Sequence, residues 1–370
     1  MDDLSAFCCL NPACKDHGRR GGDNLRVHSR CGAQKQYRIL ECRTCKGRSS
    51  ERKATPLFRS HLPEEKAVSI LEHLNEGCGV RQTGRLVKVH RDTVMRYGRL
   101  AGPHAHDAHD ELVAFSPQTR EAQFDEKWSM VYKKQEHCDP NDPADTNRGD
   151  YWDHIAYDPE HRLVVGVVPG ARVGESVEAV VGDFKRRTED RPMLLLTSDE
   201  HRPYKDAILQ AYGVEATTTP SGRPVSAPHK VAPSSLCYAT VHKVRRLGRV
   251  IEVVIRLIFG TAASLAAALL ASAVSRAVNV SFLERQHLTD RHRNARKRRK
   301  TYCFSKDWEA HEAATYFTLY SYNFCCPVRT LRARSPDGPW QKRTPAMAAG
   351  LTDHVWSLAE WLKFPAIKLE

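Results

Sequence analysis

The sequence predicts a multidomain protein in which a small cysteine-rich segment and a three-helix segment precede a mixed α/β domain with an inserted β-hairpin. Three observations predict this order. Six of the twelve cysteines lie within residues 8–45, apolar residues recur at helical spacing over 63–101, and residues 122–212 combine strand-like runs with helical segments. At 370 residues, the chain can hold two or three domains with their own cores. The expected divisions are 1–58, 59–102, a linker over 103–119, 120–326 with an insertion at about 214–275, and a basic loop and helix over 327–370.

The composition favours a polyanionic partner. The net charge is +13 and the isoelectric point is near 9.2, which predicts binding to nucleic acid, with an anionic membrane as the weaker alternative. The longest apolar run, Thr261 to Val274, is alanine-rich and too short to span a bilayer, so we expect a buried helix there. The first residues contain acids and no apolar signal region, which argues against secretion.

The N-terminal cysteines have the spacing of a structural zinc site. Cys9 and Cys14 form one close pair, and Cys42 and Cys45 form a second pair after a loop of 27 residues. Two thiolate pairs on tight turns are how a zinc ribbon builds a tetrahedral Zn²⁺ site, and the metal replaces a core that so small a segment lacks. Either Cys8 or Cys31 could instead supply the fourth ligand, and chance clustering of reduced cysteines is the other interpretation.

Residues 63–101 are expected to form three helices in a helix-turn-helix arrangement. Proline followed by two glutamates at 63–65 is a helix start, and glycines at 77 and 79 break that helix. A short helix over 80–86 and a third over 91–100 follow. The last helix of this motif enters the DNA major groove, although a small structural bundle would look similar. The candidate DNA-contacting residues are Arg81, Arg91, Thr93 and Arg96.

The next segment has the pattern of a mixed α/β sheet. We expect strands at 122–132, 151–157, 163–168 and 193–197, and helices at 176–187 and 204–212. The first and fourth strands can pair at the centre of such a sheet, which is the order of a ribonuclease-H-like fold. Asp125 lies on the first strand, and Asp199 follows the fourth at its carboxyl end, where open α/β sheets bind ligands.

Residues 214–326 contain the expected insertion and the return to the domain. Residues 214–236 look irregular, and strands at 236–244 and 250–258 flank a basic turn. We interpret these strands as a hairpin that reaches toward DNA, with a simple edge pair as the alternative. A helix is expected over 310–322, and a last helix over 352–363.

One carboxylate stands just before a dense basic run in residues 278–306. Glu284 and Arg291 are seven residues apart, so on a helix they share one face. The basic run predicts phosphate binding that weakens with salt, although a solvated surface is the alternative. Its members are Arg296, Lys297, Arg298, Arg299 and Lys300.

Three carboxylates from distant parts of the chain can together hold two magnesium or manganese ions. Oxygen ligands suit these cations, and two ions can clamp the attacking and leaving oxygens of a phosphoryl transfer. Asp125, Asp199 and Glu284 are the candidate ligands. Glu126 is a rival to Asp125, but strand alternation is expected to turn it to the opposite face, so that only one of the two joins the site.

Several segments match a known family in the same order along the chain. They are Asn11-Pro12-Ala13-Cys14, Cys42-x-x-Cys45, Gly77-Cys78-Gly79-Val80-Arg81-Gln82-Thr83, Phe124-Asp125-Glu126-x-Trp128, Thr197-Ser198-Asp199 with Pro203-Tyr204, Glu284-Arg285, Arg299-Lys300-Thr301, Phe304-Ser305-Lys306 and His311. Together they resemble the transposases of the insertion sequence 1 family, a group of DDE transposases, over nearly the whole chain.

This resemblance implies a ribonuclease-H-like catalytic domain that cleaves transposon ends with metal ions and transfers the strands into target DNA. It implies that Arg291 is the basic residue that these enzymes commonly carry seven positions after the glutamate. It also implies double-stranded DNA as the partner, a homo-oligomer on that DNA, and a nucleoid-associated place in a prokaryotic cytoplasm. Two other functions stay open: a DNA-binding regulator with an inert catalytic domain, and a structure-selective nuclease without strand transfer.

Overall fold

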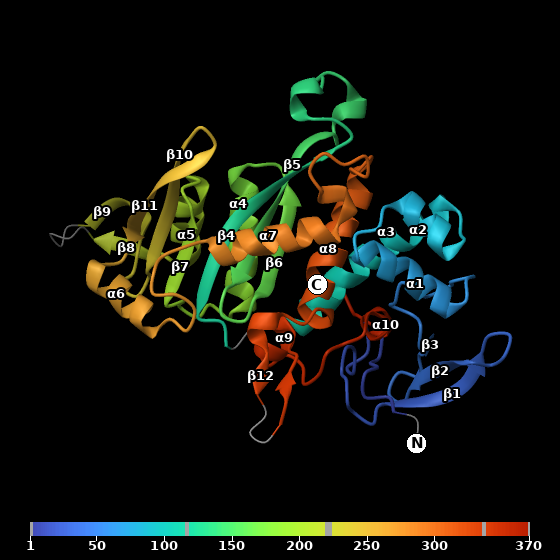
Figure 1. Cartoon of the computed structure of the whole chain (residues 1–370). Helices are drawn as coiled ribbons and strands as arrows, with labels where there is room; N and C mark the ends of the chain where they lie inside the picture. The colour runs from blue at the N-terminus through green and yellow to red at the C-terminus, as the bar shows by residue number, and fades with distance from the viewer. Residues whose placement is uncertain (1–2, 115–117, 219–223, 335–337, 369–370) are drawn as a thin grey trace.

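The computed structural model describes residues 3–114, 118–218, 224–334 and 338–368. Figure 1 shows a small sheet at the N-terminal end, a group of helices beside it, and a large sheet with helices on both faces. The C-terminal segment returns to the N-terminal half, where α10 (Leu358–Lys363) lies against α1 (Glu64–Asn75). Within the described ranges, no helix combines the length and apolar character needed to cross a bilayer.

The N-terminal sheet has very little apolar core. Its strands are β1 (Leu25–Cys31), β2 (Tyr37–Cys42) and β3 (Arg48–Ser50), antiparallel and in that order. The buried apolar set consists of Leu25, Leu40 and three cysteines. So small a cluster cannot offset the entropy of ordering the segment, so a cross-link through a bound metal is the expected source of its stability.

The helical part contains α1, α2 (Val80–Val87) and α3 (Arg91–Leu112). Gly79 caps the start of α2, and Lys88 ends it in the left-handed conformation, with φ of 57°. The side chain of His90 then accepts a hydrogen bond from the Asp92 backbone N–H and caps α3. The three helices contact one another around a common core, as the periodicity predicts.

The third helix is longer than the sequence predicts, and the linker expected from residue 103 is wrong for residues 103–112, which are helical. The reason is a row of small residues. Ala101, Ala105 and Ala108 are fully buried, and α3 packs along α8 (Trp308–Cys325). At Gly102, an added Cβ would overlap the Ala313 backbone, so only glycine permits this approach. Burial of this face outweighs the interruption by Pro103, which lies inside the helix.

The large sheet has six strands in the order β11-β10-β7-β4-β5-β6. β4, β5 and β6 form an antiparallel meander, β7 is parallel to β4, β10 is parallel to β7, and β11 is antiparallel to β10. The first and fourth of these strands along the chain are therefore neighbours at the centre, as predicted, and the arrangement resembles a ribonuclease-H-like fold. The bounds are β4 (Glu121–Val131), β5 (Gly149–Asp158), β6 (Leu163–Gly170), β7 (Leu195–Asp199), β10 (Tyr238–Arg246) and β11 (Arg249–Phe259).

Helices cover both faces of this sheet. α4 (Gly174–Arg187) and α5 (Pro203–Tyr212) pack on one face, and α7 (Ser281–Arg293) crosses the other face over β4 (Figure 1). Alternation along β4 separates the side chains accordingly. Phe124 meets Phe184 of α4 with ring centroids 5.4 Å apart, whereas Asp125 is directed toward α7.

Three expectations for residues 214–275 are corrected. The predicted hairpin is not an insertion, because β10 hydrogen-bonds to β7 and belongs to the central sheet. The segment expected to be irregular contains β8 (Val214–Thr218) and β9 (Pro224–Val231), which pair with each other. The alanine-rich helix α6 (Ala262–Ala271) is mostly exposed and not buried, because only its Ala268 is fully covered.

The remaining elements are short. The predicted final helix is reduced to α10, because the residues from 352 to 357 are not helical. The others are η1 (Gln135–His137), η2 (Pro143–Asp145), η3 (Ala295–Lys297), η4 (Arg329–Leu331), β12 (Ala333–Arg334), β13 (Trp340–Gln341) and α9 (Pro345–Ala348).

The close packing of α3 on α8 makes a test with two glycines. Gly102→Ala should lower stability by about 1–3 kcal/mol, because the new methyl group overlaps α8. Gly182→Ala in α4 should instead add about 0.5–1 kcal/mol, because nothing lies within 4 Å of the added Cβ and alanine is the better helix former. Chemical unfolding of both variants measures the difference, and equal stabilisation by both would contradict the close approach.

Candidate active site

Two aspartates meet where the central strands β4 and β7 lie side by side. The two strands are parallel, and Phe124 is opposite Ser198, so the next residues, Asp125 and Asp199, lie at the same level of the sheet. Carboxylate oxygens of Asp125, Glu126 and Asp199 all lie within 4.8 Å of one another. The sequence predicted the first and last of these acids as neighbours, and the structure brings them together.

Glu126 also belongs to this cluster, which corrects the expectation that only one of the two adjacent acids can join. Its side chain does leave β4 on the face of α5, since it accepts a hydrogen bond from the Tyr204 hydroxyl at 3.3 Å. Its side chain is 2% exposed and pairs with Arg172 at 2.6 Å. Glutamate is long enough to bring its carboxylate around the strand to Asp199, and the alternation argument took no account of that reach.

The electrostatics of the cluster are those of a cation site. Burial, together with the charges of Asp199 and Glu126, raises the pKa of Asp125 well above its ordinary value. Burial and the Glu126 charge raise the pKa of Asp199 to about 6, although the His201 backbone N–H donates to its carboxylate. Like charges at this separation favour protonation unless a positive ion compensates them. These acids therefore fit a divalent cation held by oxygen ligands.

Glu284 faces the same cleft from α7. An open cavity of about 470 Å³ is lined by Asp125, Asp199, Glu284 and several cationic side chains. The Glu284 carboxylate accepts two hydrogen bonds from the Lys243 ammonium of β10, one of them at 2.5 Å. Among the described residues, Glu284 therefore lies beside the tight acidic cluster rather than within it. Lys243 neutralises the third predicted acid.

His287 is a site residue that the sequence analysis missed. It lies one helical turn after Glu284 on α7, and its Nδ1 is 3.6 Å from Asp125 Oδ2. Burial and the nearby Lys127 and Arg291 charges lower the pKa of His287 well below its usual range, so it is neutral. The Glu284-x-x-His287 spacing, which puts both side chains on one helix face, was the signal that could have identified it.

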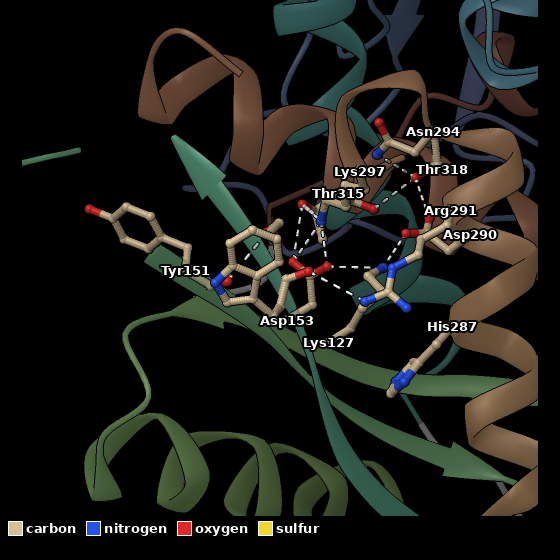
Figure 2. A network of polar contacts seen from close by, with 12 residues as sticks. Lys127, Tyr151, Asp153, His287, Asp290, Arg291, Asn294, Lys297, Thr315 and Thr318 are labelled. Atoms are coloured by element: carbon tan, nitrogen blue, oxygen red, sulfur yellow. Dashed lines mark hydrogen bonds and ion pairs between the residues drawn. The ribbon is translucent and has the colours of Figure 1, made fainter. Parts of the chain in front are cut away.

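Behind the acids lies a fully buried network of opposite charges (Figure 2). The Lys127 ammonium pairs with Asp290 and, at 3.0 Å, with Asp153. Asp153 also accepts hydrogen bonds from Lys297, one at 2.6 Å. Burial opposes ionisation of Asp153, but Lys297 and Lys127 outweigh it and hold its pKa far below the usual range. Thr318 donates to Asp290 at 2.9 Å.

The network corrects one predicted DNA contact. Lys297 was expected to bind phosphates with the rest of the basic run, but its side chain is fully buried and paired with Asp153. A buried ammonium needs such a partner, and this one comes from the neighbouring strand β5. Figure 2 shows Lys297 pointing inward to Asp153.

The other basic residues divide between packing and exposure. Arg296 is largely covered and contacts Met95 of α3 at 3.1 Å, which joins the basic run to the helical part. Arg291 reaches the Trp128 carbonyl of β4 at 3.5 Å, on the face of α7 expected from its spacing. Three side chains of the run are exposed: Arg298, Arg299 and Lys300.

The predicted DNA-contacting residues of the helical part lie at its surface. Arg81, Arg91 and Arg96 are exposed, and Thr93 is partly exposed. A groove of about 600 Å³ separates α2 and α3 from residues 294–318, and its lining includes Arg81, Arg91 and Arg296. The arginines of α2 and α3 are thus accessible, and two of them, Arg81 and Arg91, line this groove.

The four predicted cysteine ligands meet at one point. The sulfur atoms of Cys9 and Cys45 are 3.6 Å apart, those of Cys14 and Cys42 are 3.9 Å apart, and the four lie within 4.8 Å of one another. The Gly47 backbone N–H and the Asn11 side chain lower the pKa of the Cys45 thiol to about 6, which favours its thiolate, whereas burial raises the pKa of Cys9. Among the described residues, neither Cys8 nor Cys31 belongs to this group.

Comparisons with known proteins identify no family. No family model matches the chain, and no curated protein matches it. Among solved structures, a Mos1 strand transfer complex aligns with 40% of this chain at 12% identity, with a TM-score of 0.16. A pre-cleavage Mos1 transpososome aligns with 41% at 13% identity, with a TM-score of 0.17. The chain spans little more than half the length of those proteins, 56% and 58%, and a likeness this weak carries no argument.

The cysteine site can be tested by removing one ligand. Cys42→Ser should lower the zinc content of purified protein by about one ion per chain and unfold the N-terminal sheet, because thiolate pairs hold structural zinc. The control Cys31→Ser should keep the metal, since Cys31 lies outside the cluster. Elemental analysis and proteolysis of residues 3–58 measure the two effects, and equal zinc in both variants would refute the site.

The raised pKa of Asp199 predicts that the ionised Asp199 carboxylate lowers the stability of the fold. Because its folded-state pKa is near 6 and its ordinary value is 3.8, the folded protein binds more protons than the unfolded chain between these values. Stability therefore falls as the pH rises through this window. Asp199→Asn should stabilise the metal-free protein above pH 6, on the order of 1–3 kcal/mol, and have little effect near pH 4.

Thermal unfolding at both pH values, with a chelator present, measures this effect. Asp190→Asn is the matched control, because Asp190 is exposed and lies outside the acidic cluster. The melting temperature of this control should follow that of the wild-type protein at both pH values. A loss of stability in Asp199→Asn above pH 6 would contradict the raised pKa.

Proposed function

We propose that this protein is a DNA transposase of the DDE type, which uses divalent metal ions to cleave transposon ends and to transfer the strands to target DNA. One observation carries the proposal: acids from β4 and β7 converge at the centre of a ribonuclease-H-like sheet, and Glu284 of α7 faces the same cleft. The sequence resemblance to insertion sequence 1 transposases supports the same three acids as the catalytic set.

Under this proposal, Asp125, Asp199 and Glu284 hold the metal ions, and Glu126 adds negative charge beside them. Two bound magnesium or manganese ions would activate a water or a DNA 3′-hydroxyl and stabilise the leaving 3′-oxygen. His287 keeps a neutral ring against Asp125 and adds no charge to the site. Lys243 and Arg172 line the cleft and can contact phosphates of the bound strand.

The substrate would be held by several positive surfaces. The exposed arginines of α2 and α3 are suited to recognise the transposon end, and Arg298, Arg299 and Lys300 to bind its backbone. We further propose that zinc, held by the four cysteines, orders the N-terminal sheet for this DNA binding. Backbone contacts of this kind should weaken steeply as salt rises.

The test is cleavage of a supercoiled plasmid that carries the ends of the element. Wild-type protein should cut at those ends with magnesium or manganese. Glu284→Gln should bind the same DNA with unchanged affinity and lose cleavage by at least about 100-fold, because it keeps the shape of the side chain and loses its charge. Glu178→Gln, which changes an exposed glutamate on α4, is the matched control and should cut normally.

The outcomes separate the candidate functions. Binding to the ends without cleavage by wild-type protein, under both metals, would favour a regulator with an inert catalytic domain. Cleavage that depends on DNA shape and not on the end sequence, with no strand transfer, would favour a nuclease. Undiminished cutting by Glu284→Gln would remove Glu284 from the catalytic set.

A further inference from the structure

The two edge strands of the large sheet, β6 and β11, differ in whether side chains hydrogen-bond to their outward backbone groups. At the β6 edge, side chains from the helices occupy the outward backbone groups. The Val164 N–H donates to Asn323 Oδ1 at 3.0 Å, and Asn323 Nδ2 donates to the Val164 carbonyl at 2.8 Å. The Tyr320 hydroxyl accepts from Val167 N–H at 3.2 Å. This edge is closed to any further strand.

The β11 edge is bare and apolar by comparison. In the described part of the chain, no side chain hydrogen-bonds to the backbone of β11. Val253 and Ile255 lie on one face of the strand and are 52% and 46% exposed, and Ile251, at a β-bulge just before them, is 61% exposed. The row continues into Leu257, which packs against α6. A long, exposed edge strand of β-branched residues is a template for pairing with another strand.

The positions of the two charged residues on β11 favour pairing with a second copy of the same strand. Glu252 and Arg256 lie symmetrically about Val254, and they are the charged side chains within the apolar stretch from Val250 to Phe259. An antiparallel pair of two β11 strands, related by a two-fold axis at Val254, sets Glu252 opposite Arg256 of the partner subunit, twice. Centring the pair on Glu252 or on Arg256 would set like charges against each other, which is unfavourable.

We propose that β11 is a homodimer interface, in which it pairs antiparallel with β11 of a second copy and joins the two large sheets into one. The axis at Val254 sets Val253 opposite Ile255 of the partner subunit, so that residues that face each other lie on the same side of the joined sheet. Sliding one strand by a single residue would set residues from opposite sides against each other. The arrangement closes at two subunits, because the interface is isologous and the β6 edge is occupied. The proposal is independent of the proposed catalysis.

Association in solution gives the first test. Sedimentation of the metal-loaded full-length protein, without DNA, should show a dimer. Ile251→Lys combined with Val253→Lys should give a monomer, because lysines on an edge oppose strand pairing. Leu270→Lys is the matched control: Leu270 is an exposed apolar residue of α6, 75% accessible, and lies off the edge. A monomeric wild type at about 100 μM, or a double-lysine variant that stays dimeric, would overturn the proposal.

The register has its own test through charge exchange. Glu252→Arg alone, or Arg256→Glu alone, should weaken the dimer by about tenfold, since each places like charges opposite one another at two symmetric positions. The double variant should recover the wild-type dissociation constant. Additive weakening in the double variant would exclude this register. Arg256 also contacts Glu200 of its own chain, so Glu200→Gln serves as the control for losing that pair.

Cross-linking gives a readout of the axis itself. In a Cys303→Ser background, which removes the exposed native thiol among the described residues, Val254→Cys should form a covalent dimer under mild oxidation, because that residue faces its own copy. Val250→Cys should not, because it lies four residues from the axis and beyond the β-bulge at Ile251. Equal cross-linking at both positions, or capture of another protein by Val254→Cys in place of a dimer, would show that a different strand occupies this edge.

Discussion

The structure of the candidate site depends on two lysines and two aspartates that are buried together. Lys127, Asp153, Asp290 and Lys297 come from β4, β5, α7 and η3, and their side chains have no solvent exposure or almost none. The charges balance within the group. Loss of one member would leave an unpaired buried charge, at a cost of about 3–5 kcal/mol. The network therefore fixes how α7 crosses the sheet, because a small displacement of α7 would separate charges that have no access to water.

Next to this network of balanced charges lies the acidic cluster, whose charges are not balanced. Lys127 lies two residues after Asp125 on the same face of β4, and Asp290 lies six residues after Glu284 on α7. The buried network thus fixes β4 and α7, the two elements that carry Asp125 and Glu284. Burial and the repulsion between the acids raise the pKa of Asp199, and the acids stay together because the charges of the framework behind them are balanced. Active sites commonly concentrate such unfavourable charge, and the surrounding fold compensates for it.

The sequence predicted features with a short-range signal and missed those that depend on three-dimensional reach. The apolar run before Asp199 and the cysteine spacings located β7 and the four-thiol cluster correctly. The participation of Glu126 could not be predicted from alternation alone, because it depends on the reach of a long side chain toward Asp199, where β7 ends. Lys297 looked like its basic neighbours, and only the position of Asp153 on β5 explains its burial. Likewise β10 looked like an insertion, since parallel pairing with β7 leaves no local mark in the sequence.

The length of α3 has a mechanical consequence. Its 22 residues span about 33 Å, from the exposed arginines Arg91 and Arg96 to the sheet domain, with α8 packed along the helix. Because α8 packs along α3 on both sides of Pro103, the orientation of the first turn of α3 also sets the orientation of the cleft lined by Asp125, Asp199 and Glu284. Each residue of a helix advances the direction of a side chain by about 100°. Adding or deleting one residue between the arginines and Gly102 would therefore rotate the helical part of the molecule by about 100° relative to the sheet domain. The number of residues in this segment thus sets the angle between the two parts.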